Sequence, residues 1–453
     1  MFVRLSKLIT MRVPTFLLAF CVVAAVCFLG CDAVKVADSA ESAGTALEVA
    51  VFEGGFGIDW HKRIARQYGE LDPGKNISVN LWGDPRVDEK IKPRILRRSP
   101  PDAADCLLPI WKLILAGKLY PLDEFLDSPA WDQPGTTWRE TLIPGVLDSY
   151  TYKGQVYGVS LVFSAWVIWY DERQFREHGW EVPSTWSELE SLCEQIKGDG
   201  VAPFAFQGKY PDYAWSTYLT LLHRLGGTEA FRRTQNIEKG AFLQPEAVEA
   251  ARMVQNLARD HFQRGAMAMT HTESQMEFVN NRAAMVVCGL WLENEMREAT
   301  PPEFEMACFP FPAVEGGKGD PTAAYGGGGH LWTVFSDATH PREVCRFLKY
   351  MFSKENARDF SRTLGTLTTV KVAAGREDMS PTLASALDIV ENSNEFFLDR
   401  LTLLYLEWTN ETMATGIARL VQQEISPEEF CRLLEDGLEK VRNDPNIYKP
   451  PPM

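Results

Sequence analysis

The 453-residue sequence has no motif that assigns a catalytic mechanism by itself. It lacks a GxSxG segment, an HExxH segment, a strand-linked GxGxxG, and a GxxxxGK loop followed by Ser or Thr. Its seven histidines are dispersed without the spacing of a metal site, and no CxxC pair is present. These absences argue against serine hydrolases, zinc proteases, P-loop enzymes and dithiol redox proteins.

A surplus of positive charge is also lacking. The chain has 61 acidic and 46 basic residues, a net charge of −15, which disfavours sequence-independent binding to nucleic acid or to an anionic membrane surface. Glycine and proline are scattered and aromatic residues make up 11% of the chain, so disordered and collagen-like classes are excluded. The length predicts two or three compact lobes.

The N-terminal region predicts export. Basic residues without acids precede an apolar run from Phe16 to Leu29, which indicates a secretory signal peptide over residues 1–30, starting at Met1 or Met11. The run ends at Gly30-Cys31, which resembles a bacterial lipobox, so we expect Cys31 to carry a lipid. An ordinary cleaved signal and a retained anchor helix are the alternatives. Residues 31–45 are rich in Ala, Ser, Asp and Glu and predict a flexible tether.

Cysteine spacing beyond the leader indicates buried free thiols. Most of these residues lie in apolar runs, and a disulfide between Cys288 and Cys308 is the alternative. The six are Cys106, Cys193, Cys288, Cys308, Cys345 and Cys431.

Short apolar runs that alternate with amphipathic stretches predict α/β lobes built on largely parallel sheets. Strands are expected at 47–52, 77–82, 105–110, 203–206, 283–287 and 331–335, and helices at 59–70, 86–97 and 185–197. Thr185 with Glu188, and Ser426 with Glu429, have the spacing of helix capping boxes. Tyr150, Tyr152 and Tyr157 suggest either a ferric-ion site or a hairpin, and the intervening Lys-Gly favours the hairpin.

Aromatic and polar residues gather in loops after the predicted strands, where open α/β sheets bind ligands. These loops lie at 53–57, 109–111, 288–295 and 325–330, and the last contains four consecutive glycines that suit close passage of another segment. Aromatic rings cover the C–H faces of sugars while polar groups bind hydroxyls, so this mixture indicates a sugar site. Glu293 and Glu295 imitate a glycosidase dyad, although a solvated helix face explains them as well.

These features together resemble the extracellular solute-binding proteins, family 1, that deliver carbohydrates to bacterial ABC transporters. The resemblance runs from about Leu47 to Asn443 and rests on the order and spacing of several segments. They are Tyr157–Ser160 with Val167–Phe175, Gly179 with Pro183–Leu189, Phe278–Met285, Gly289–Trp291 and Phe347–Phe360.

The resemblance implies two α/β lobes joined by three hinge crossings, with the ligand in the cleft between them. The implied lobes are 46–158 plus 330–365 and 162–325 plus 366–445, with a tail at 446–453. The crossings are expected near 158–163, 323–331 and 364–370. The glycine run would then lie at a hinge.

Carried over position by position, the family pattern places twelve residues at the ligand. Trp291 and Trp408 match stacking rings, whereas Trp166, Trp169, Trp186 and Trp332 are predicted in the core. The twelve are Glu53, Phe56, Trp111, Ser164, Gln207, Tyr210, Trp291, Asn294, Glu295, Gly328, His330 and Trp408.

The function that the resemblance implies is capture of a mono- or oligosaccharide and its delivery to a membrane permease. The segment 288–296 looks most like members that bind N-acetylglucosamine or chitobiose. Two positions differ from those members: Leu290 stands where they have Ser, and His330 stands where they have an acidic residue. We expect a monomer with no cofactor, metal, nucleic-acid partner or catalytic residue. A surface-anchored glycoside hydrolase or lyase and a binder of a non-sugar solute are the alternatives.

Overall fold

The computed structural model describes residues 44–106, 108–371, 373 and 375–453. Residues 44–453 form one compact unit. The predicted signal peptide, the lipidation site Cys31 and nearly all of the predicted tether lie outside the described residues. Within the described part, no helix has the length and apolar character needed to cross a membrane.

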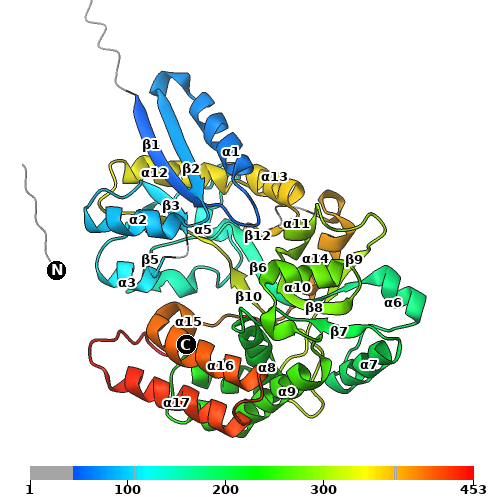
Figure 1. The fold of residues 1–453 in the computed structure, drawn as a ribbon. Coiled ribbons are helices and arrows are strands. Elements are labelled where there is room, and N and C mark those ends of the chain that lie inside the picture. The colour runs from blue at the N-terminus through cyan, green and yellow to red at the C-terminus, as the bar shows by residue number, and fades with distance from the viewer. Residues whose placement is uncertain (1–43, 107, 372, 374) are drawn as a thin grey trace, which may run out of the picture. The chain divides into compact units, whose positions relative to one another are not determined.

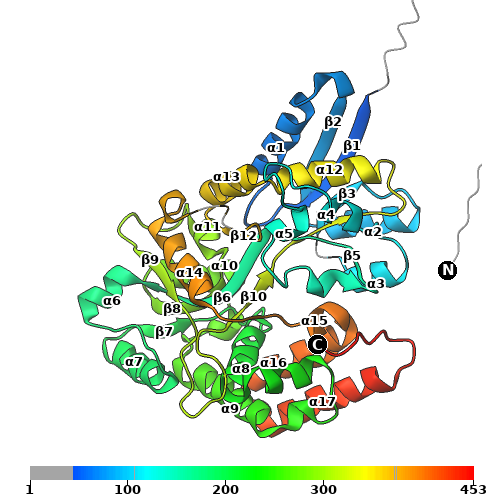
Figure 2. The ribbon, with the colours of Figure 1, turned by 180° about the vertical axis from the view of Figure 1, so that it is seen from behind.

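The first lobe is built on a four-stranded sheet in the order β11-β3-β1-β2. The strands β1, β2 and β3 are parallel, and β11 runs antiparallel to β3, with Leu331 opposite Cys106. Their bounds are β1 Thr45–Phe52, β2 Ile77–Asp84, β3 Ala103–Cys106 and β11 Leu331–Val334. Figures 1 and 2 show this sheet with helices on both faces.

Alternation along β1 decides which helices cover each face. Leu47, Val49 and Val51 point to one side and pack in one cluster with α1 (Asp59–Glu70) and α12 (Pro341–Met351). Ala50 points to the other side, in a cluster with α2 (Val87–Leu96) and α3 (Ile110–Leu115). The shorter α4 (Asp123–Leu126) and α5 (Trp138–Thr141), and α13 (Lys354–Leu364), complete this lobe.

The second lobe is built on a sheet in the order β13-β10-β6-β8-β7, with β12 and β9 also paired to β6. Because β6 runs antiparallel to β8, β9, β10 and β12, this sheet is mixed, which corrects the expectation of largely parallel sheets. Its strands are β6 Val162–Asp171, β7 Ala202–Ala205, β8 Ala283–Gly289, β9 Met306–Phe309, β10 Ala324–Gly328, β12 Leu367–Thr368 and β13 Phe396–Phe397.

Helices of the second lobe surround this sheet and continue into a C-terminal helical group (Figure 1). Around the sheet lie α6 Glu172–His178, α7 Trp186–Gly198, α8 Tyr213–Gln235, α9 Pro245–His261, α10 His271–Val279, α11 Leu292–Met296 and α14 Pro381–Asn392. The C-terminal group contains α15 Leu401–Leu404, α16 Ala414–Val421 and α17 Pro427–Asn443, with a π-helical turn at Trp408–Met413.

The chain passes between the two sheets three times. It leaves the first sheet before β6, returns between β10 and β11, and leaves again between α13 and β12. The short hairpin of β4 (Thr151–Tyr152) and β5 (Gln155–Val156) precedes the first passage, as the tyrosine spacing predicted.

The glycine run forms a strand at the second passage. Gly326 pairs with Ala165 of β6, and a Cβ atom on Gly326 would lie 2.5 Å from the carbonyl oxygen of Ser164. Real Cβ atoms do not approach backbone that closely, so only glycine fits here. Close passage of a neighbouring segment, the expectation from the sequence, therefore explains Gly326.

Local signals in the sequence located several elements well. Both capping boxes form, Thr185 with Glu188 on α7 and Ser426 with Glu429 on α17. One strand was placed wrongly, because β3 ends at Cys106 and Ile110 already begins α3.

The six cysteines of the described residues are buried free thiols. A Cys288–Cys308 disulfide is excluded because β6 lies between their strands, with Val167 opposite Cys288 and Trp169 opposite Cys308.

Candidate functional site

The loop that follows β1 lies directly on α11 of the second lobe. The side-chain amide of Asn294 donates a hydrogen bond to the backbone carbonyl of Gly55. A Cβ atom on Gly55 would lie 2.9 Å from Cγ of Glu295, so glycine is needed for this approach. Two of the loops selected from the sequence, 53–57 and 288–295, are thus brought together from opposite lobes.

Trp291 lies between β8 and α11, and its ring covers Gly289. A Cβ atom on Gly289 would lie 2.0 Å from the six-membered ring, which explains why glycine precedes Trp291 by two residues. Trp291 is half-buried and meets Trp166 of β6 edge to face, with ring centroids 5.3 Å apart. Trp166 is therefore half-buried beside the site, which corrects its assignment to the core, whereas Trp169, Trp186 and Trp332 are buried as expected.

A polar network continues from these rings. Oε2 of Glu295 lies 2.7 Å from Nε2 of His271 and accepts a 2.7 Å hydrogen bond from the amide of Gln275. The ring of Tyr213 packs on His271 at 5.3 Å and on Trp166 at 5.1 Å. We call this group the Trp291 cluster; it contains Trp166, Tyr213, His271, Gln275, Trp291 and Glu295.

Several buried polar atoms at this place have no protein partner. They include Oγ of Ser164, Nδ1 of His271 and Oε1 of Gln275. Ser164 points to the same face of β6 as Trp166, since side chains alternate along a strand. A buried polar atom without a partner costs about 1–3 kcal/mol, so this region is suited to a ligand that carries hydroxyl or amide groups.

The other residues selected from the sequence have varied surroundings. Gln207 is buried and accepts a 3.2 Å hydrogen bond from the hydroxyl of Ser274, while Tyr210 is 48% exposed. Glu53 is exposed on the loop after β1. Gly328 ends β10, where a Cβ atom would lie 2.9 Å from Cβ of Ser160.

Glu293 and Glu295 do not share one site. Burial raises the pKa of Glu293, whose partners are Ser380 and Arg297. Glu295 instead contacts His271 and Gln275. Residues two apart on a helix do not face each other, which explains the separation.

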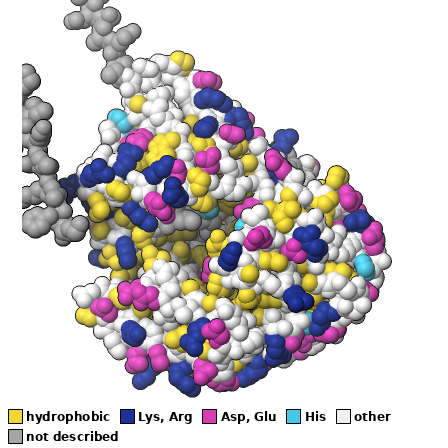
Figure 3. Space-filling view, in the orientation of Figure 1, with side chains coloured by type: hydrophobic (Ala, Val, Ile, Leu, Met, Phe, Trp, Pro, Cys, Tyr) yellow, Lys and Arg dark blue, Asp and Glu magenta, His cyan; other side chains and the backbone are white. Residues whose placement is uncertain are grey.

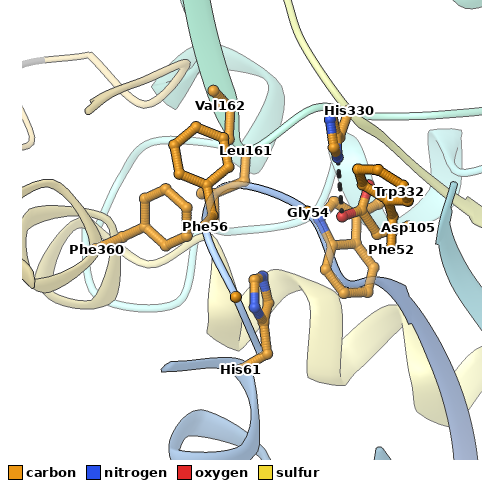
Figure 4. A pocket seen from close by; sticks show the side chains of 11 residues that line it. Phe52, Gly54, Phe56, His61, Asp105, Leu161, Val162, His330, Trp332 and Phe360 are labelled. Atoms are coloured by element: carbon orange, nitrogen blue, oxygen red, sulfur yellow. Dashed lines mark ion pairs between the residues drawn. The ribbon is translucent and has the colours of Figure 1, made fainter. Parts of the chain in front are cut away.

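Phe56, Asp105 and His330 line a small cavity of about 10 Å³ beneath the loop (Figure 4). Nδ1 of His330 lies 3.6 Å from Oδ2 of Asp105, and the ring of Phe56 packs on His330 and Phe360 at 6.4 and 6.0 Å. Burial alone would lower the pKa of His330, but the charge and hydrogen bond of Asp105 raise it overall. His330 therefore holds the second passage between the lobes against β3.

His61 on α1 lies in the same cavity and gives a pH-dependent prediction. Burial lowers its pKa to about 4, so folded protein keeps it neutral while unfolded chain protonates near pH 6.5. The free energy of unfolding therefore falls as the pH falls from about 6.5 towards 4. Between pH 7 and 5.5, urea denaturation should show wild type losing about 1 kcal/mol more than His61→Gln. Equal losses would mean that His61 takes up a proton in the folded state.

Trp111 and Trp408 form a second group, at a pocket of about 340 Å³ between α3 and the C-terminal helices. Trp111 belongs to α3 rather than to a strand end. Trp408 is 4% exposed, donates its indole N–H to the carbonyl of Leu434 and packs on Trp215. The structure therefore places Trp408 in the core of the second lobe, with its edge at the pocket. In the orientation of Figure 1, the surface of the molecule is hollowed between the lobes, and hydrophobic side chains lie along the hollow (Figure 3).

Two α/β lobes connected by three passages, with aromatic and polar side chains near the place where their loops meet, define the two-lobed solute-binding fold. A solved structure described as a chitin oligosaccharide binding protein has this fold, with a TM-score of 0.70 and 20% identity, over 84% of this chain and 94% of that one.

The chain belongs to the bacterial extracellular solute-binding proteins, whose family model matches residues 89–385. The diacetylchitobiose binding protein NgcE of Streptomyces coelicolor is 26% identical over 73% of this chain and 71% of its own length. A multiple sugar-binding protein of Streptococcus mutans is 24% identical, over 71% and 74%.

Proposed function

We propose that this protein captures a mono- or oligosaccharide between its lobes and delivers it to the permease of an ABC transporter. The observation that carries the proposal is the meeting of the Trp291 cluster with the loop containing Phe56. Glu295 of this cluster lies against Gly55, and Asn294 donates to the carbonyl of Gly55, so the loop of one lobe meets the segment that carries the aromatic rings and unpaired polar atoms of the other. A sugar presents the same mixture of C–H faces and hydroxyls.

The sugar class that we propose is N-acetylglucosamine or a short oligosaccharide of it, such as chitobiose. Support comes from the similarity to a protein that binds diacetylchitobiose. Amide groups such as Gln275 suit an N-acetyl group, because they both donate and accept. Leu290 is buried, so it acts on the ligand only through the position of Trp291.

The lobe boundaries are part of this proposal: 46–158 with 330–365, and 162–325 with 366–445. Apart from Thr45, the first residue of β1, the strands of the first sheet fall within the first set, and β6, β7, β8, β9, β12 and β13 fall within the second. Because a ligand shifts an open–closed equilibrium only by its differential affinity, contacts from both lobes are what make binding a signal. We propose that the protein acts as a monomer without a cofactor or metal.

Calorimetry with a panel of sugars tests the function. We expect binding of diacetylchitobiose or a related saccharide, and no binding of a peptide, a polyamine or ferric ion in the same assay. Binding of one of those solutes, with silence from all sugars, would refute the proposal. Chitooligosaccharides incubated with the protein and followed by chromatography test the hydrolase alternative, which steady cleavage would establish.

We further propose that the protein is exported and held at the cell membrane by a lipid on Cys31. In cells, Cys31→Ala should move the protein from the membrane fraction to the soluble fraction, as immunoblotting of fractions would show. Cys193→Ala, which alters a buried thiol, is the matched control and should stay with the membrane. Persistence of the Cys31→Ala protein in the membrane would indicate a retained helix instead.

A further inference from the structure

The segment that follows α17, residues 444–453, is fastened to the second lobe at both ends. The backbone N–H of Asp444 donates to the carbonyl of Lys440, continuing the last turn of the helix. At the other end, the N–H of Met453 donates to Asn236 at 2.9 Å, and Arg400 donates to the carbonyl of Pro451 at 3.2 Å. We call residues 444–453 the Tyr448 segment.

The middle of the Tyr448 segment reaches the first lobe. The ring of Tyr448 stacks on Trp111 of α3, with centroids 5.3 Å apart and planes 20° apart, and meets Tyr152 edge to face at 5.2 Å. Ile447, the preceding residue, packs instead on the second-lobe cluster that contains Trp408. Two consecutive side chains therefore contact opposite lobes, so the segment is a strap between them.

This contact covers a ring that the family pattern places at the ligand, Trp111. Trp111 is only 6% exposed, and both Trp111 and Tyr448 line the pocket of about 340 Å³. A sugar ring stacks on an indole by lying against its flat face, as Tyr448 does here. Tyr448 and a sugar therefore cannot occupy that face of Trp111 at the same time.

We propose that the Tyr448 segment is an autoinhibitory strap, in which Tyr448 occupies the stacking face of Trp111 and must leave before a sugar binds there. This inference rests on the proposed function. An aromatic pair of this kind is weak enough for a ligand to displace. Its loss is nevertheless expected to change the sugar affinity by about two- to tenfold. The strap lowers the affinity for every sugar that stacks on Trp111. Sugars that bind weakly are the first to lose detectable binding.

The test is calorimetry on the full chain with diacetylchitobiose and the sugar panel. Tyr448→Ala removes the competing ring and should bind about two- to tenfold more tightly than wild type, while Tyr448→Phe keeps the stack and the wild-type affinity. Tighter binding by Tyr448→Ala alone supports the strap. Unchanged or weaker binding overturns it, and weaker binding would make Tyr448 a sugar contact.

Hydrogen exchange gives a second readout on the unmodified protein. Saturating sugar should speed amide exchange at residues 446–449, because the segment leaves Trp111; unchanged or slower exchange overturns the strap. The two proposals fail in different ways. If wild type binds a sugar and Tyr448→Ala binds it no better, only the strap is wrong. If neither chain binds any sugar, the proposed function is wrong and the strap with it.

Discussion

Trp291→Ala is expected to weaken saccharide binding by about 1–3 kcal/mol, or roughly 5- to 150-fold, because a large aromatic face is lost from the site. Trp291 also supports Trp166, with ring centroids 5.3 Å apart, so the variant loosens a second ring. The measurement is calorimetry with the sugar that wild type binds most tightly. Trp291→Phe keeps a smaller ring, so its sugar affinity should lie between those of wild type and Trp291→Ala.

Trp131→Ala is the matched control for this loss. Trp131 is 43% exposed and packs on Tyr68 and Tyr350 of the first lobe, apart from the Trp291 cluster. Its removal should leave the sugar affinity unchanged. An unchanged affinity in Trp291→Ala with an intact fold would contradict the assignment and make Trp291 a packing residue.

Gly326→Ala is expected to cost about 3 kcal/mol of unfolding free energy, because its methyl group would meet the backbone of β6. The Cβ atom would lie 2.5 Å from the carbonyl oxygen of Ser164 and 2.9 Å from Cα of Ala165, and neither atom can move without shifting the strand. Since Ser164 and Trp166 lie on the same strand, sugar affinity should fall as well. Urea denaturation and calorimetry measure the two effects.

The next residue provides the control. The atoms nearest to a Cβ atom on Gly327 would belong to the side chain of Leu398, the first at 3.3 Å, and a side chain can turn aside. Gly327→Ala should therefore cost less than about 1 kcal/mol. Equal losses for the two variants would show that general stiffening of the glycine strand, rather than contact with β6, determines its stability.

Sequence signals that act within one turn or one strand predicted the structure best. The capping boxes at Thr185 and Ser426 form because their hydrogen bonds join residues three apart and need no tertiary partner. The third strand was misplaced because Leu107–Ile110 is apolar, and apolar character alone does not separate a short strand from a buried helix start.

A family pattern selects some residues of the candidate site from the sequence, whereas others join it only because the folded chain brings them together. Asn294 and Glu295 contact the loop after β1, which joins two segments that the family pattern selects, and their binding of a ligand stays a prediction. His271 and Gln275 had no signal, because an isolated histidine and glutamine on an amphipathic helix look like solvated residues until Glu295 is placed beside them. Trp166 was assigned to the core because an aromatic residue in an apolar strand is usually buried on both sides.

The six buried thiols of the described residues are protected in the folded protein from reagents that attack thiolates. Burial raises the pKa of Cys193 and Cys431 to about 12, so almost no thiolate exists at neutral pH while the chain is folded. On unfolding, these groups regain an ordinary acidity and react at once. The labelling rates of Cys345, on α12 of the first lobe, and of Cys431, on α17 of the second, therefore report the opening of each lobe when each labelled residue is identified separately.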